Sequence, residues 1–330
     1  MNEAIETREL ITVTAGEFRI RGTYHRSSDN RICTGRWNPV GVLFLSPGFL
    51  PRAAAGDSAV YWADSLAKCG YPSFRLDLPA LGDSDGDVLR PILDFIHAGG
   101  YAPGLSAAMK DLVERFSLSG VVIFGHCAGA VTAIYTAAVS KDCKGLVLQD
   151  PYFFLPQERP KIRAELSNWV SWSRLGGLAS NVYHFLRHIR LLVRRNRPPK
   201  NANLPLLRCF HQLASAGMPI LVLKAPALKT RGLKPRVGEF DYIGYLQALC
   251  GRSSRVVVQY IEGTNHSFAD PDGRAAVRHH TEQWLQSNAY RGTIPEPAES
   301  HDRGVCGREK SDAGAESDQP LSRAPGAPAR

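Results

Sequence analysis

The chain has 330 residues, of which 44% are hydrophobic and 22% are charged, and its formal net charge is +9. This length and composition allow a sizeable hydrophobic core, in one large α/β domain with an insertion or in two modest domains. The start, MNEAIETREL, carries acids where a signal peptide has a basic region, and no apolar run approaches the roughly 18 residues of a membrane span. We therefore expect a soluble cytoplasmic protein without a transmembrane segment.

The cysteine pattern argues against a disulfide-rich protein and against a zinc-binding protein. There are seven of them, scattered along the chain and without CxxC spacing. This pattern argues against a disulfide framework and against a structural zinc site, and we predict neither a metal nor a cofactor. Most cysteines are expected to be small buried hydrophobic side chains. Cys127 is the exception because of its position in the chain.

Predicted strands and helices alternate along the amino-terminal half. Residues 9–25 alternate apolar and polar side chains around Ala15-Gly16, which is typical of a β-hairpin. The following pattern predicts a buried strand at 40–46, a helix at 59–70, a strand at 71–77, a helix at 104–118, a strand at 120–124, a helix at 128–140 and a strand at 143–150. Such alternation predicts a parallel sheet with helices on both faces, to which the hairpin adds an antiparallel edge.

The carboxyl-terminal half contains an interruption and then resumes the pattern. Residues 152–217 are aromatic, basic and mostly helical, and we interpret them as a cap between two parts of the core, 1–151 and 218–289. The second part has predicted strands at 218–225 and 254–261 and predicted helices near 239–250 and at 272–287. Residues 290–330 are rich in Pro, Gly, Ala, Ser and charge, so we expect a disordered tail.

The stretch FGHCAGA, residues 124–130, places Cys127 at the centre of a Gly-x-nucleophile-x-Gly box between a strand and a helix. The small residues Gly125, Ala128 and Gly129 allow the helix to pack close to the strand. The amino end of the helix faces the thiol and favours the thiolate. We therefore predict that Cys127 is a nucleophile.

Two backbone amides are expected to form an oxyanion hole beside this thiol. One is the amide of Ala128, and the other comes from the loop after strand 40–46. In that loop Gly48 permits close backbone approach, and the Phe49 amide is the expected donor. His126 flanks the nucleophile, and the sequence leaves its role open: it lines the pocket, donates a hydrogen bond to the substrate, or packs in the core.

The expected base is His266, which lies in the stretch EGTNHSF after the last predicted strand. The third member of a triad is less clearly marked. Asp150 ends the strand 143–150, whereas Glu239 and Asp241 follow strand 218–225 at a distance. A cysteine–histidine pair that works without an acid is a third alternative, since a thiolate needs less help than a serine hydroxyl.

Four stretches occur in the order typical of the α/β-hydrolase superfamily: LSPGF, RLDLPALGDSDGD, GHCAGA and GTNHSF. Over residues 9–287 the chain resembles its serine aminopeptidase/lipase-like members, in a branch with a cysteine nucleophile. This resemblance implies the α/β-hydrolase fold, with a mostly parallel eight-stranded sheet flanked by helices and a helical cap after the sixth strand. The superfamily usually has its acid soon after the seventh strand, near Leu228 in this chain, and none stands there.

The chain also resembles the hydrolase family associated with exosortase A systems of exopolysaccharide clusters. That family shares a cysteine at the elbow, a basic helical insertion after the sixth strand and a Glu-Phe pair downstream of the seventh. It usually has aspartate after the cysteine, where this chain has Ala128.

These features predict a hydrolase or acyltransferase that acts on an ester or thioester through an acyl-cysteine intermediate, as in a thioesterase-like step of a biosynthetic or exopolysaccharide pathway. Two alternatives remain: an inactive scaffold that binds a ligand or partner, and a lactone hydrolase similar to dienelactone hydrolase. The basic stretch 182–200, with Arg190 and Arg194, is expected to dock an acyl carrier protein or coenzyme A. No nucleic-acid-binding motif accompanies it.

Overall fold

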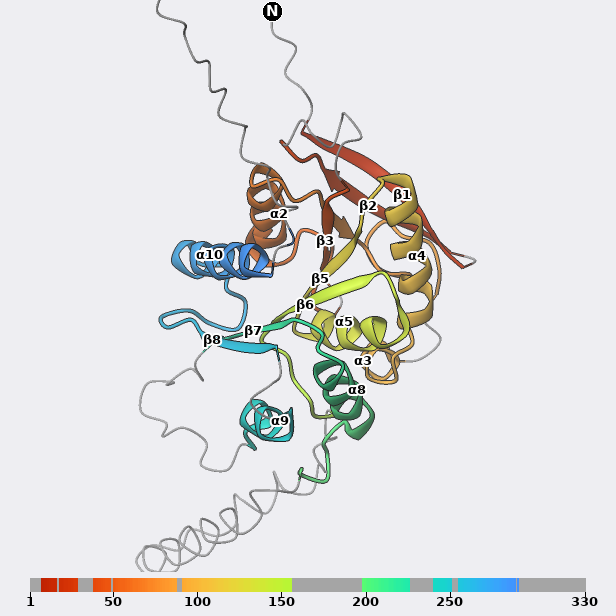
Figure 1. Cartoon of the computed structure of the whole chain (residues 1–330). Coiled ribbons are helices and arrows are strands. Elements are labelled where there is room, and N and C mark those ends of the chain that lie inside the picture. The colour runs from red at the N-terminus through yellow and green to blue at the C-terminus, as the bar shows by residue number, and fades with distance from the viewer. Residues whose placement is uncertain are drawn as a thin grey trace, which may run out of the picture. The chain divides into compact units, whose positions relative to one another are not determined.

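A central eight-stranded sheet organises the protein, as seen in the computed structural model (Figure 1). The structure describes residues 7–16, 18–28, 38–48, 50–87, 91–155, 198–225, 240–250, 255–288 and 290. The strands are β1 (Arg8–Ala15), β2 (Phe18–His25), β3 (Val40–Leu45), β4 (Ser73–Leu76), β5 (Gly120–His126), β6 (Cys143–Gln149), β7 (Ile220–Lys224) and β8 (Val256–Tyr260).

The strand order is β1-β2-β4-β3-β5-β6-β7-β8. The pairs β1–β2 and β2–β4 are antiparallel, which confirms the predicted hairpin at the edge, and every other neighbouring pair is parallel. The short apolar runs of β3 and β5 are fully buried, as expected for central strands covered on both faces. The carboxyl ends of the parallel strands therefore meet at one edge of the sheet.

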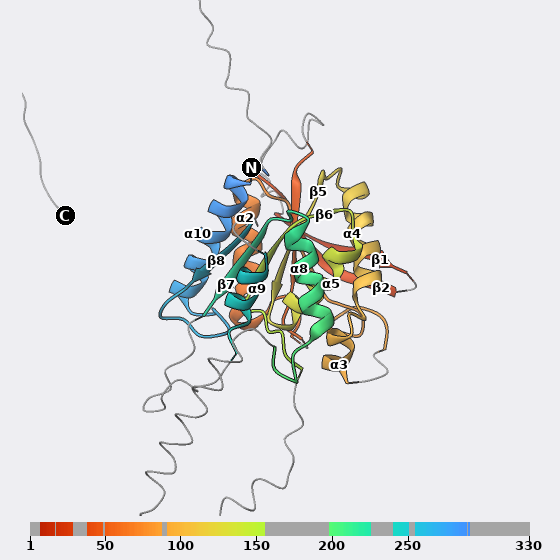
Figure 2. The same ribbon diagram turned by 60° about the horizontal axis from the view of Figure 1, so that its bottom comes forward.

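Helices cover both faces of this sheet. They are α2 (Ser58–Lys68), α3 (Ile92–His97), α4 (Ala102–Arg115), α5 (Ala128–Val139), α8 (Leu204–Ser215), α9 (Tyr242–Cys250) and α10 (Pro271–Ser287), with a 3-10 turn at Ala55–Asp57. One face carries α2 and α10, which contact each other, and the other carries α4, α5 and α8 (Figure 2). Among the described residues, no helix is long and apolar enough to cross a membrane.

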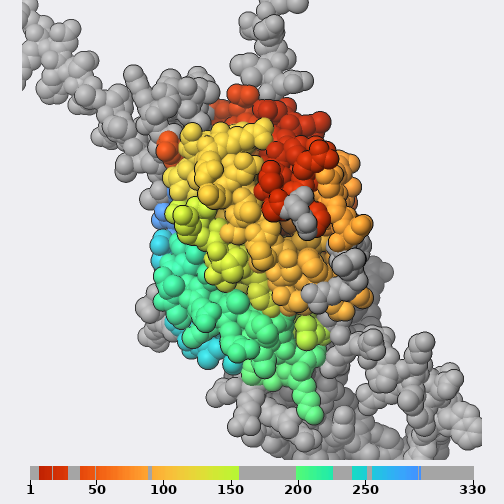
Figure 3. Space-filling model, turned by 90° about the vertical axis from the view of Figure 1, so that its right-hand side faces the viewer, coloured from red at the N-terminus to blue at the C-terminus, as the bar shows by residue number. Residues whose placement is uncertain are grey.

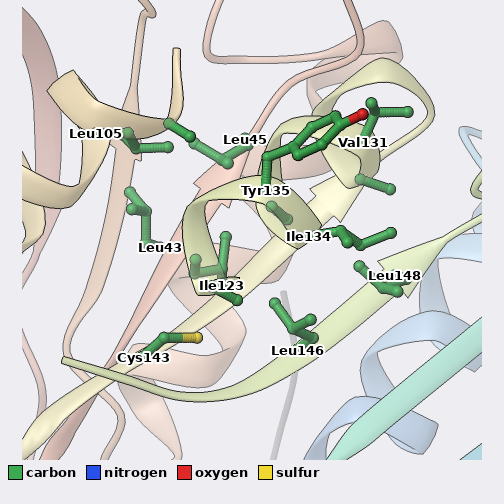
Figure 4. Packing of buried hydrophobic residues seen from close by; sticks show 14 of the residues in the cluster. Leu43, Leu45, Leu105, Ile123, Val131, Ile134, Tyr135, Cys143, Leu146 and Leu148 are labelled. Atoms are coloured by element: carbon green, nitrogen blue, oxygen red, sulfur yellow. The ribbon is translucent and has the colours of Figure 1, made fainter. Parts of the chain in front are cut away.

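Helix α5 lies at the centre of the larger core. Nearly all of its side chains are buried, because α4 and α8 flank it and three strands lie beneath it. Val131 and Ile134 of α5 pack against side chains of neighbouring strands, such as Ile123 and Leu146 (Figure 4). Cys143 belongs to the same cluster and is buried, as expected for a cysteine that serves as a small hydrophobic residue.

Helix α8 comes from the segment that we interpreted as a cap, and it packs on the core. Its residues fall within 152–217, yet Leu206, Leu207 and Phe210 are buried in the same core as α5. The space-filling view shows α8 (green) continuous with the yellow surface that includes α4 (Figure 3). The sequence did not indicate this packing, because an amphipathic period does not say which neighbour covers the apolar face. The remainder of the predicted cap, 156–197, and most of the predicted tail, 291–330, lie outside the described residues.

Candidate active site

Cys127 occupies a strained turn between β5 and α5. Its backbone has φ 55° and ψ −114°, a region that residues other than glycine rarely adopt. The turn is held from both sides, since the Cys127 amide donates to the Gln149 carbonyl at 2.9 Å and the Cys127 carbonyl accepts from Ala130 at 3.1 Å. The turn therefore fixes the thiol at the edge where the parallel strands end.

Two glycines allow α5 to begin this close to the sheet. A Cβ atom on Gly125 would lie 2.7 Å from the Ala130 Cα. A Cβ atom on Gly129 would lie 2.8 Å from the Ser46 carbonyl oxygen and would also meet the Leu45 carbonyl. No side chain fits at either position without moving backbone, which explains why the sequence around the cysteine consists of small residues.

The loop after β3 approaches the same helix end. Gly48 has φ +52°, and a Cβ atom there would lie 3.8 Å from the Ala128 Cβ. The loop is anchored behind this point, because the Arg52 amide donates to Asp77 Oδ1 at 2.6 Å and the Arg52 guanidinium pairs with the same buried carboxylate. Within the backbone bonds of the described ranges, the Ala128 amide has no acceptor. Phe49, the other expected donor, lies outside the described residues.

His266 lies in the loop that follows β8 and contacts a carboxylate from β6. Its Nδ1 donates to Oδ2 of Asp150, which directly follows β6 and whose side chain is only 12% exposed. This bond leaves Nε2 as the ring nitrogen available to the Cys127 side chain, which also interacts with His266. Three of the predicted site residues, from three separate strand ends, thus come together.

The interactions at this site shift the pKa values of His266 and Asp150. The hydrogen bond with Asp150, followed by the interaction with Cys127, raises the pKa of His266 to about 10, although burial acts in the opposite direction. Burial would raise the pKa of Asp150, but the bond from His266 and the charge of Lys224 outweigh it and lower that pKa. At neutral pH the site therefore holds an imidazolium between a carboxylate and a thiol side chain.

The comparisons with known proteins agree with this topology. A family model described as the alpha/beta hydrolase fold matches residues 42–176. The esterase Pf2001 of Pyrococcus furiosus superposes with a TM-score of 0.55 at 14% identity, over 85% of this chain and 90% of that chain. The chain has the α/β-hydrolase fold. A dienelactone hydrolase of Anabaena variabilis shares it, with a TM-score of 0.51 at 15% identity over 85% of this chain and 97% of that chain. No curated protein matches the sequence of the chain.

Within this α/β-hydrolase fold, Asp150 is the candidate acid that contacts His266 among the described residues. Asp241 instead accepts from the Gly244 amide at 2.9 Å and caps the first turn of α9. Asp241 therefore has its partner where a helix begins, whereas Asp150 contacts His266. Glu239 lies outside the described residues.

His126 is buried beside the loop that carries His266. It is buried, and its Nε2 donates to the carbonyl oxygen of His266 at 2.8 Å. Burial lowers the pKa of His126 to about 4, so the ring is neutral and holds the His266 loop through its backbone. The sequence left the role of His126 open, and these contacts are those of a packed side chain beside the His266 loop.

Two residues at the site were missed by sequence reasoning. Lys224, the last residue of β7, pairs through Nζ with Oδ1 of Asp150. Tyr152 follows β6, and burial together with the charge of Cys127 raises its pKa to about 12. The available signal was positional: both residues lie at carboxyl ends of parallel strands, where the side chains of an α/β site converge. Among the described residues, no cluster of His, Cys, Asp or Glu could hold a metal ion.

Proposed function

We propose that this protein is a hydrolase or acyltransferase that cleaves an ester or thioester through an acyl-cysteine intermediate. The observation that carries this proposal is the position of His266 between Asp150 and Cys127, with a pKa raised to about 10. A histidine that is protonated at neutral pH is poorly suited to activate a serine, but it is suited to pair with a thiolate. We assign Cys127 as nucleophile, His266 as acid and base, and Asp150 as the residue that orients His266.

The proposed reaction has two steps. The Cys127 thiolate attacks the carbonyl carbon, and the negative charge moves to the carbonyl oxygen, where the Ala128 amide and an amide of the Gly48–Phe49 segment stabilise it. The carbonyl reforms as the bond to the leaving group breaks, and His266 Nε2 gives its proton to the departing sulfur or oxygen. His266 then takes a proton from water or another acceptor, which attacks the acyl-cysteine and restores the thiolate.

A cysteine nucleophile favours a thioester donor. Transfer of an acyl group from one sulfur to another exchanges bonds of nearly equal energy, whereas transfer from an oxygen ester to sulfur is uphill. The acyl-cysteine is also reactive toward amines and alcohols, so acyl transfer and hydrolysis are both accessible. We propose a thioesterase-like step in a biosynthetic pathway, for which the resemblance to the exosortase-associated hydrolases suggests exopolysaccharide assembly.

The partner in this proposal is an acyl carrier protein or coenzyme A. Its support is the basic composition of 182–200, which lies almost wholly outside the described residues. Reversal of charge at Arg190 and Arg194 is expected to raise KM for a carrier-bound donor and to leave kcat unchanged. An unchanged KM would remove the docking role and leave the chemistry standing.

The reaction class is tested by turnover of matched substrates that share one acyl group, a coenzyme A thioester and an oxygen ester. Wild type should prefer the thioester, and Cys127→Ala should abolish turnover of both. His266→Gln should lower kcat/KM by about 10²-fold or more. Full activity in Cys127→Ala would show that another group performs the reaction.

A second candidate is hydrolysis of a lactone. It is supported by the likeness to the dienelactone hydrolase of Anabaena variabilis, which at 15% identity concerns the fold, and by the same elbow cysteine. Turnover of a dienelactone by wild type and not by Cys127→Ala, without turnover of thioesters, would favour it. If the folded protein binds these compounds and turns over none, it is a ligand-binding scaffold.

A further inference from the structure

The Asp150 carboxylate contacts two cationic side chains, one through each oxygen. Its Oδ2 accepts from His266 Nδ1, while its Oδ1 pairs with Lys224 Nζ. Both oxygens of a mostly buried carboxylate are therefore occupied, and the carboxylate plane is fixed between the two partners. The Lys224 side chain is 26% exposed, so solvent screens this pair only in part.

The register of the sheet builds this arrangement into the fold. Gln149 pairs with Leu223 across β6 and β7, and the Asp150 amide donates to the Leu223 carbonyl at 2.7 Å. Asp150 and Lys224 are therefore neighbours at the ends of adjacent strands, and Asp150 has a positive φ of 45°. Lys224 is held by rigid backbone next to the carboxylate that holds His266.

Lys224 is one of two cationic groups that act on the Asp150 carboxylate. Among the described residues, His266 and Lys224 are the groups whose charge lowers the pKa of Asp150. Among the described residues, other titratable side chains at the ends of the neighbouring strands include Cys127, the neutral His126, Tyr152 and Tyr260, which pairs in register with Lys224. None of these four is a second fixed cation.

We propose that Lys224 is a positioning residue that acts through Asp150: its ammonium group holds the carboxylate toward His266 and limits how tightly His266 keeps its proton. A carboxylate that served His266 alone would stabilise the imidazolium more strongly. An acid that must release its proton to a leaving group works best when it does not hold that proton too firmly. This inference rests on the proposed function for its catalytic meaning, but its test needs no substrate.

The test is the titration of His266 in protein labelled with ¹⁵N-histidine. The His266 signal is assigned by its loss in His266→Gln. Lys224→Met removes the charge, Lys224→Gln removes the charge but keeps a donor for Oδ1, and Lys224→Arg keeps the charge. Lys141→Met is the matched control, because Lys141 is exposed and precedes the opposite end of β6.

In both neutral variants the titration midpoint of His266 should rise by about one pH unit, since a cation a few ångströms away is removed. In Lys224→Arg and Lys141→Met it should match wild type. An unchanged or lower midpoint in the neutral variants would overturn the inference, and Lys224→Gln decides it if Lys224→Met does not fold. If the midpoint rises as expected but no acyl-cysteine forms, the role of Lys224 stands and the proposed function fails.

Discussion

The bond between Asp150 and His266 orients the histidine that we propose as acid and base. It is the first cause of the raised pKa of His266, and the interaction with Cys127 is the second. A thiolate needs an oriented base less than a serine hydroxyl does, because the thiol ionises far more readily. Loss of the carboxylate should therefore be milder here than in a serine triad.

We expect Asp150→Asn to lower kcat/KM for a thioester about tenfold, against about 10²-fold or more for His266→Gln. The pKa of His266 should fall in Asp150→Asn, because its largest cause is removed. Asp241→Asn is the control: it keeps a capping side chain on α9, so activity should be unchanged. A loss in Asp150→Asn as large as in His266→Gln would show that the acid is as essential as in a serine enzyme.

At the scale of elements, the start of α5 couples fold and function. The helix start lies against the backbone at the end of β3 only because Gly125 and Gly129 lack side chains. The contact involves the backbone of β3, which lies in the centre of the sheet and has no room to move.

Gly129→Ala should destabilise the protein by about 1–3 kcal/mol, because the new Cβ overlaps the Leu45 and Ser46 carbonyls. Activity should fall even where the variant is folded, since the start of α5, which carries Cys127, is displaced from the loop after β3. Gly104→Ala is the matched control in α4, where a Cβ would lie 3.6 Å from Ala15 and where alanine should stabilise by up to about 1 kcal/mol. Urea denaturation of the two variants measures both changes in the free energy of unfolding. Equal stability of Gly129→Ala and wild type would contradict the packing account.

The same scale shows what the sequence could predict. Strands and long helices were predicted correctly, because period and turn residues mark each of them locally. Helix α3 was missed because six residues are too few to show a helical period. The place of α8 on the core, the bond from His126 to the His266 loop and the pair of Lys224 with Asp150 were not predictable, since each depends on contacts between distant segments.

The whole molecule should be most stable near pH 7, where the contributions of the buried histidines and of His266 balance. Burial lowers the pKa of both His25 and His126 from 6.5 to about 4. The unfolded chain therefore binds more protons between these values, and stability falls as the pH falls from about 6.5 to about 4. His266 has the opposite sign: its contribution is complete below about 6.5 and is lost as the pH rises through about 10.

Each buried histidine should lower the free energy of unfolding by about 3 kcal/mol over that acidic window. His25→Gln should flatten the dependence of the free energy of unfolding on pH, because glutamine does not take up a proton. In the native protein the neutral His25 ring accepts from Arg75 at 2.8 Å and donates to Asp64 at 2.7 Å. Urea denaturation of wild type and His25→Gln at pH 5 and pH 8 measures both slopes. Equal free energies of unfolding for wild type at the two pH values would contradict this assignment.

The most direct measurement of the central claim is the mass of the intact protein after brief incubation with acyl thioesters of increasing length. Wild type should gain the mass of one acyl group, Cys127→Ala should gain none, and His266→Gln should gain it slowly. Peptide mapping should place the group on Cys127. Absence of an adduct from wild type across all chain lengths, with Cys127 no more reactive toward iodoacetamide than the exposed thiol of a small peptide, would contradict the account.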